Sequence, residues 1–134
     1  MIVILAMIGC DGMFDSFGGA DKKIEELPLM ISAIKTAQVE NYDLLGFYVE
    51  AEPYPKKPSS DLKKWEISSS GGFKDLAWSP GPEVKGVYGS YSIKVTGDDF
   101  VVIGVSDIDG DGVFATYTAT KDTDPKVKTD KGIY

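Results

Sequence analysis

Histidine and arginine are both absent from this chain of 134 residues, and cysteine occurs once, at Cys10. Without histidine the chain lacks the commonest general base and the commonest metal ligand of proteins. A single cysteine excludes a disulfide bond within the chain and a zinc site built from cysteine and histidine. Serine- or cysteine-based hydrolysis would need a different base, such as lysine. These absences remove most familiar enzyme classes.

The charge balance argues against a nucleic-acid partner. Fourteen lysines stand against 21 aspartates and glutamates, and the formal net charge is −7. A surface of this sign repels a phosphate backbone, and arginine, which makes bidentate contacts with phosphates and bases, is missing. The length suits one domain with a buried core. We expect an apolar segment and a glycine-rich tract over residues 1–19 (an anchor or the remnant of a filament helix) and one globular domain over residues 20–134.

The first nine residues form an uncharged apolar run that is shorter than the roughly 20 residues of a membrane-spanning helix. One interpretation is a buried core strand. A second is a lipoprotein processing site, because Met7 to Cys10 places a small residue before the cysteine, although no positively charged region precedes it. Cys10 is then a candidate lipidation site, and its lipid would anchor the domain to a membrane.

The clearest helix is expected from Ala20 to about Asp43. Asp21 is a candidate N-cap, and Gly46 suits the end of the helix. Pro28 either kinks this helix or marks the first turn of its main part. Apolar residues recur near the helical period of 3.6 and predict one buried face: Ile24, Leu27, Met30, Ile31, Ile34 and Ala37.

The second half of the chain switches to the two-residue period of strands. Residues 47–60, with three prolines, are expected to form a loop, and Trp65 and Trp78 to anchor loops or fill the core. An antiparallel meander is predicted from Gly86–Val95, Phe100–Val105 and Val113–Thr120, followed by an exposed tail. The apolar run Phe100–Val105 indicates a central strand, with Ile103 and Val105 expected in the core. The predicted fold class is α+β, an N-terminal helix packed on a sheet of three to four antiparallel strands.

Three carboxylates, Asp107, Asp109 and Asp111, alternate with other residues between two predicted strands. Their spacing matches the first half of a helix-loop-helix calcium loop, but Thr118 stands where that loop needs a bidentate glutamate. A hairpin could still bind calcium, because oxygen ligands suit this ion rather than a transition metal. The candidate metal ligands are Asp107, Asp109, Asp111, Asp122 and Asp124.

The alternative is that this segment is only a tight turn, in which aspartate and glycine are favoured for backbone reasons. The three carboxylates also repel one another at short range. Catalysis by them is disfavoured, since nothing in the sequence locates the paired acid and nucleophile of a two-carboxylate glycosidase.

Four segments, in their order and spacing, resemble the type IV pilin and pseudopilin family. They span roughly residues 31–120, and the apolar start of the chain also resembles the N-terminal helix of that family. Leu5 stands where the family usually has glutamate, and the usual initial phenylalanine is missing. The four segments are Ala33–Gln38 with Glu40 and Tyr42, Phe73–Pro80, Val87–Ser92 and Asp107–Gly112.

This resemblance implies a pilin-like fold and a non-enzymatic role as a structural subunit of a type IV pilus, a secretion pseudopilus or a related extracellular filament. The implied partners are other pilin-like subunits or assembly proteins, in a homo-oligomer or filament. The implied location is extracytoplasmic, at the cell surface or in the periplasm, with the N-terminus in contact with the membrane. The alternative is a periplasmic or cell-surface binding module of the same fold, anchored by lipid on Cys10.

Overall fold

The computed structural model of the chain describes residues 25–81 and 84–129. Its main helix, α3 (Glu26–Leu45), ends at Gly46, whose φ of 84° suits a residue without a side chain and whose N–H donates to the carbonyl of Tyr42 at 2.8 Å. Gly46 is therefore confirmed as the helix end. Pro28 lies in the first turn, where a missing N–H costs no intrahelical bond. The expected N-cap Asp21 lies outside the described residues.

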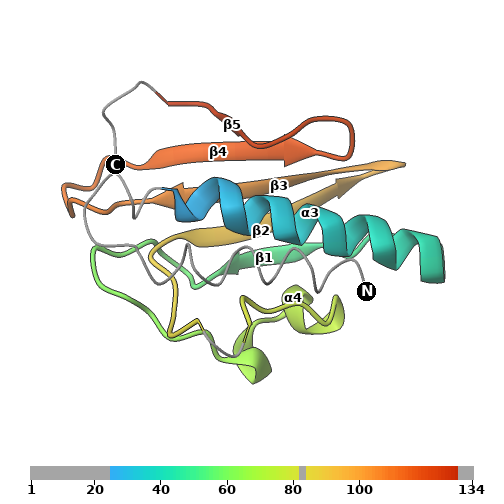
Figure 1. Cartoon of the computed structure of the whole chain (residues 1–134), viewed down its shortest axis with the longest axis horizontal. Coiled ribbons are helices and arrows are strands. Elements are labelled where there is room, and N and C mark those ends of the chain that lie inside the picture. Colours follow the sequence, from blue (N-terminus) through green and yellow to red (C-terminus); the bar gives the residue numbers. More distant parts are fainter. Residues whose placement is uncertain (1–24, 82–83, 130–134) are drawn as a thin grey trace.

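The sheet has five antiparallel strands in the order of the chain: β1 (Ala51–Tyr54), β2 (Ser90–Thr96), β3 (Asp99–Ser106), β4 (Ala115–Thr120) and β5 (Lys126–Val127). α3 lies across one face of this sheet and packs against β3 and β4 (Figure 1). The predicted α+β class and the antiparallel meander are confirmed. The sheet has five strands where three to four were expected, and two of the five, β1 and β5, lie outside the three segments predicted as strands.

The two unexpected strands occupy the edges of the sheet. β1 falls within the proline-containing stretch that was expected to be a loop; Pro53 is tolerated because an edge strand need not donate on both sides. β5 falls within the expected exposed tail and has only two residues. Both strands are too short to show a two-residue period in the sequence.

The central strand β3 has one buried and one half-exposed row of side chains. Phe100 and Val102 belong to the buried row, with 2% and 0% of their surface exposed. Ile103 and Val105 belong to the other row, which is only half-buried, so the expectation that they lie in the core is wrong. β3 is nevertheless central, because it pairs with β2 on one side and with β4 on the other.

The connection from β1 to β2 contains a 3-10 turn, η1 (Ile67–Ser69), and a short helix, α4 (Gly72–Asp75). α4 lies against β1 so closely that a side-chain carbon on Gly72 would meet the carbonyl oxygen of Glu50 at 2.1 Å. The indole of Trp65 makes edge-to-face contacts with Phe73 at 5.3 Å and with Trp78 at 5.4 Å between ring centroids. Both tryptophans are half-buried and anchor this connection, as expected.

One hydrophobic core joins the helix, the sheet and the connection. The core residues come from α3, from β1 to β4 and from the segment before β2. They are Leu27, Met30, Ile31, Ile34, Ala51, Phe73, Leu76, Val87, Tyr91, Ile93, Phe100, Val102 and Ala119.

Candidate functional site

The acidic cluster lies in the hairpin between β3 and β4, at the end of the sheet where α3 begins (Figure 1). The three carboxylates of Asp107, Asp109 and Asp111 each offer an oxygen atom, and these atoms lie within 4.8 Å of one another. Asp109 and Asp111 are exposed and Asp107 is half-buried. The sequence correctly predicted that these three side chains come together.

Backbone N–H groups hold the three carboxylates in place. The carboxylate of Asp107 accepts from the N–H of Gly112 at 3.2 Å, and that of Asp111 accepts from the N–H of Val113 at 2.8 Å. Gly110 and Gly112 have φ angles of 70° and 83°, which favour glycine. These contacts are also what a turn built from aspartate and glycine would make without an ion.

Within the cluster, the pKa values of Asp109 and Asp111 are shifted in opposite directions. The pKa of Asp109 is raised by desolvation and, to a smaller extent, by the side-chain contact with Asp111 and the charges of Asp111 and Asp107, although the hydrogen bond from the Asp111 N–H acts in the opposite direction. The pKa of Asp111 is lowered, mainly because its carboxylate accepts the Val113 N–H. A divalent cation would offset this mutual repulsion, and the donors, all carboxylate oxygens, suit calcium.

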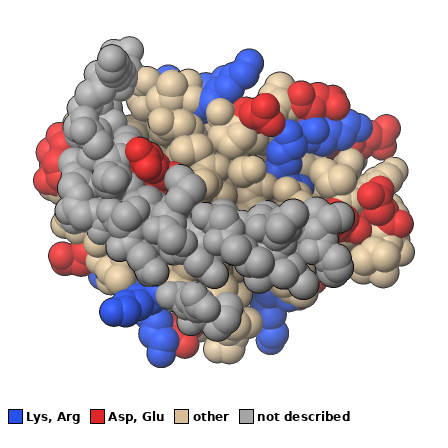
Figure 2. Space-filling model, viewed as in Figure 1, with Lys and Arg blue, Asp and Glu red and all other residues tan. Residues whose placement is uncertain are grey.

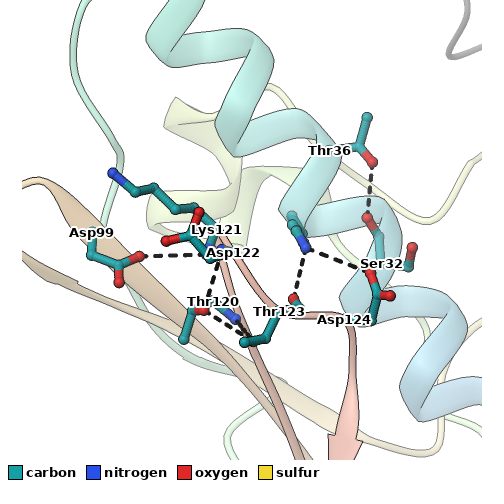
Figure 3. Close-up of polar contacts among 9 residues, drawn as sticks. Ser32, Thr36, Asp99, Thr120, Lys121, Asp122, Thr123 and Asp124 are labelled. Carbon is teal, nitrogen blue, oxygen red and sulfur yellow. Dashed lines mark hydrogen bonds and ion pairs between the residues drawn. The ribbon is translucent and has the colours of Figure 1, made fainter.

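Asp122 and Asp124, the other two candidate ligands, lie at the opposite end of β4. The strand places them about 20 Å from the hairpin, at a rise of about 3.3 Å per residue. The backbone N–H of Asp122 donates to the hydroxyl of Thr120, and Asp124 lies 3.7 Å from the ammonium of Lys35 (Figure 3). The five-residue ligand set is therefore reduced to the three residues of the hairpin. Cys10 lies outside the described residues.

Acidic side chains appear at both ends of the long axis in the view of Figure 2. Exposed apolar side chains also occur at both ends. At the C-terminal end of α3, Leu44, Leu45 and Phe47 are 82%, 63% and 52% exposed. At the other end, the hairpin exposes 51% of Val113 and 42% of Phe114. Each end of the domain thus combines apolar contact surface with negative charge.

Two polar residues that were not predicted to be buried, Glu26 and Gln38, are almost completely enclosed in the structure. Both lie on the buried stripe of α3, four residues before Met30 and four residues after Ile34. That spacing was a signal that could have located them, because residues four apart share one face of a helix. They mark the two ends of the contact between α3 and the rest of the domain.

Comparisons with protein-family models, with curated proteins and with solved structures found no match. Within the described part of the chain, no helix has both the length and the apolar character needed to cross a membrane.

Proposed function

We propose that the chain is a pilin-like structural subunit of an extracellular filament, such as a type IV pilus or a secretion pseudopilus. The observation that carries this proposal is the packing of one long helix, α3, along one face of an antiparallel meander that follows it in the chain. This order agrees with the resemblance of residues 31–120 to the pilin and pseudopilin family. The role is mechanical, and the chain would act outside the cytoplasm without making or breaking bonds.

The exposed apolar residues at the two ends of the domain support contacts between subunits. The end with Leu44, Leu45 and Phe47 and the end with Val113 and Phe114 are different surfaces on opposite sides of one molecule. A contact between unlike surfaces repeats from one subunit to the next and produces a filament unless the rotation closes a ring. Because both ends are acidic, added salt should strengthen this contact by screening the repulsion.

The proposal is tested in cells that produce the full chain, with filaments sheared from the surface and labelled by an antibody to the domain. We expect the chain in the filament fraction, with an apolar N-terminus that is methylated or unprocessed by mass spectrometry. A diacylated Cys10 in the membrane fraction, with no chain in filaments, would instead support the lipid-anchored binding module.

A pair of variants tests the contact itself. The double substitution Leu44→Lys, Leu45→Lys should preserve folding, because both residues are exposed and cations are favourable at a helix C-terminus. It should remove the chain from filaments. The matched control is Leu62→Lys, on a side chain that is 44% exposed in the long connection, and this variant should assemble normally.

We also propose that the hairpin binds calcium as a structural ion. The three carboxylate oxygens within 4.8 Å of one another support this second proposal. The ion would make no contact with Asp122 or Asp124, and its function would be to hold the hairpin in one conformation.

A further inference from the structure

Two helices of the described residues, α3 and α4, pack on the sheet, and both lie on the same face. α3 covers the buried row of β3, and α4 lies on that side because a side-chain carbon on Gly72 would meet Cβ of the buried Ala51 at 2.7 Å. The opposite face, called the outer face, carries the half-buried row of β3, which consists of Val101, Ile103 and Val105. A sheet with one solvated face normally has polar residues there, so an aliphatic row in its centre favours a contact surface.

One row of side chains on the outer face crosses all five strands. Ile103 stands in its centre, because it pairs with Ser92 of β2 and with Thr118 of β4. Thr118 in turn pairs with Lys126 of β5. On the other side, Glu52 of β1 faces Ser92 at the irregularity in the pairing of β1 with β2. The row therefore begins with an acidic residue at one edge of the sheet and ends with a basic residue at the other.

Glu52 and Lys126 cannot pair with each other within one molecule. Both are exposed, and neither makes an ion pair within residues 25–81 and 84–129. They lie on opposite edges of the sheet (Figure 1), and four strand spacings of about 4.8 Å separate these edges by about 19 Å. The two charges are therefore open to a partner that presents the same charges in reverse order.

A second copy of the chain presents the row in that order. If two outer faces meet around a two-fold axis parallel to β3, the β1 edge of each copy lies over the β5 edge of the other. Glu52 then faces Lys126 of the second copy at two symmetric places, and Ile103 packs against Ile103 of the second copy. Lys94, on the outer face of β2, then lies opposite Thr120 rather than another charge, because these two residues flank the same residue of β3.

We propose that the chain forms a symmetric dimer in which the outer faces of two copies pack against each other. Aligned sheets pack about 10 Å apart with strands that cross at about 30°, and the side chains of Glu52 and Lys126 can bridge that separation. Asp99 also lies on the outer face, but it is about 14 Å along β3 from Ile103, where the crossing strands of the two copies have diverged.

The size of the outer face predicts a weak dimer. Five strands at the spacing and rise of an antiparallel sheet cover about 500 Å² on each copy. The total of about 1,000 Å² is typical of reversible interfaces. The contact is closed by its two-fold symmetry, so it is separate from the contact between unlike ends proposed for the filament and leaves both ends free.

The test is sedimentation velocity of the full chain with Leu44→Lys and Leu45→Lys, the substitutions that remove the proposed end contact. We expect a reversible dimer with a Kd on the order of 10–100 μM. A chain that stays monomeric up to about 1 mM would overturn the dimer and leave the filament proposal standing. A dimer in this background supports the outer face whether or not the natural chain forms filaments.

A substitution on the axis tests which face is used. Ile103→Lys should abolish the dimer, because it places an ammonium group of each copy at the centre of the contact. The matched control is Val127→Lys, since Val127 is 52% exposed and pairs with Tyr117, on the side of the sheet that α3 covers. This control should dimerise normally. A dimer that persists in Ile103→Lys would use another surface and would overturn the proposal.

A charge exchange tests the two-fold arrangement and keeps the proposal testable if Ile103→Lys does not fold. Glu52→Lys and Lys126→Glu should each raise the Kd at least about fivefold, because each creates two pairs of like charges. The two substitutions together should restore the Kd to within about twofold. The control combination Lys74→Glu, Asp75→Lys exchanges exposed charges on α4 and should have no effect. Failure of the combined variant to restore the dimer would overturn the pairing of Glu52 with Lys126.

Discussion

The side-chain amide of Gln38 pairs with the backbone of Val49 through two hydrogen bonds. Its nitrogen donates to the Val49 carbonyl at 2.8 Å, and its oxygen accepts the Val49 N–H at 2.9 Å. Gln38 is fully buried in the second half of α3, and Val49 lies just before β1. The amide thereby satisfies both polar groups of a residue that none of the described strands pairs with, and it fixes where the chain turns back from the helix.

Replacing Gln38 with leucine should destabilise the domain by about 2–4 kcal/mol, because both polar groups of Val49 lose their partner in a partly buried position. The measurement is urea unfolding followed by circular dichroism. Thr36→Ala, on the exposed side of the same helix, is the control and should change the free energy of unfolding by less than about 0.5 kcal/mol. Equal effects of the two substitutions would contradict the role of the amide.

Two valines of β3 provide a matched pair for the two faces of the sheet. Val102 is fully buried, and Val105 belongs to the half-exposed row. Val102→Ala should cost about 2–3 kcal/mol through lost burial and a residual cavity. Val105→Ala should cost about 1 kcal/mol or less. If thermal unfolding gave the reverse order, the side of the sheet that α3 covers would be wrongly assigned.

Burial raises the pKa of Glu26, and this shift predicts how stability depends on pH. The folded state holds this proton more tightly than the unfolded state, so the contribution of Glu26 is fully present below pH 4.5 and is lost as pH rises through the raised pKa. The difference in free energy of unfolding between the natural protein and Glu26→Gln should therefore decrease across that window. A difference that is constant with pH would mean that Glu26 titrates normally in the folded state.

Calcium should raise the melting temperature if it binds the hairpin, because an ion that binds only the folded state stabilises it with increasing saturation. A chelator should reverse the effect, and the double variant Asp109→Asn, Asp111→Asn should not respond. The matched control, Asp122→Asn, Asp124→Asn, removes two charges from the other end of β4 and should respond fully. If millimolar calcium did not change the melting temperature, the proposal of a calcium site would be wrong, and the hairpin would be only a tight turn built from aspartate and glycine.

The turn after β4 is attached to α3 by Lys35, whose ammonium donates to the Thr123 carbonyl at 2.6 Å (Figure 3). Lys35→Met keeps the length of the side chain and should cost about 1.5–3 kcal/mol, the range for hydrogen bonds of charged groups. Asp124→Asn should cost less than about 0.5 kcal/mol, because Asp124 is almost fully exposed and lies 3.7 Å from the ammonium. Equal losses in urea unfolding would mean that the ion pair, not the carbonyl contact, holds the turn.

The parts of the fold that follow a periodic pattern could be predicted from the sequence. The stripe from Leu27 to Ile34 predicted α3. Alternation predicted β2 and β4, and a nearly continuous apolar run predicted β3 between them. β2 begins at Ser90 rather than Gly86, since the N–H groups of Tyr88 and Gly89 bond to the carboxylate of Glu26. No local pattern could reveal this, because the partners are more than 60 residues apart.

The candidate site, too, could be predicted only where it depends on residues that are close in the sequence. Asp107, Asp109 and Asp111 are close in sequence, so their meeting required only a turn. The placement of Asp122 and Asp124 depended on the direction and length of β4, because a strand of six residues carries its end away from the hairpin. Which face of β3 is buried could not be predicted from its apolar run, because Val and Ile occupy the half-exposed row as well as the buried one.

The sequential order of the sheet also governs how the chain can fold as it emerges from a ribosome or a translocation channel. β2, β3, β4 and β5 can each pair with the preceding strand as soon as they appear. Among the described residues, β1 has no partner strand until the whole connection of residues 55–89 has passed, and α3 has no sheet to cover until β3 and β4 exist. Through that interval the apolar stripe of α3 remains open to solvent, so the earliest of the described elements is also the one that waits longest for the surface it covers.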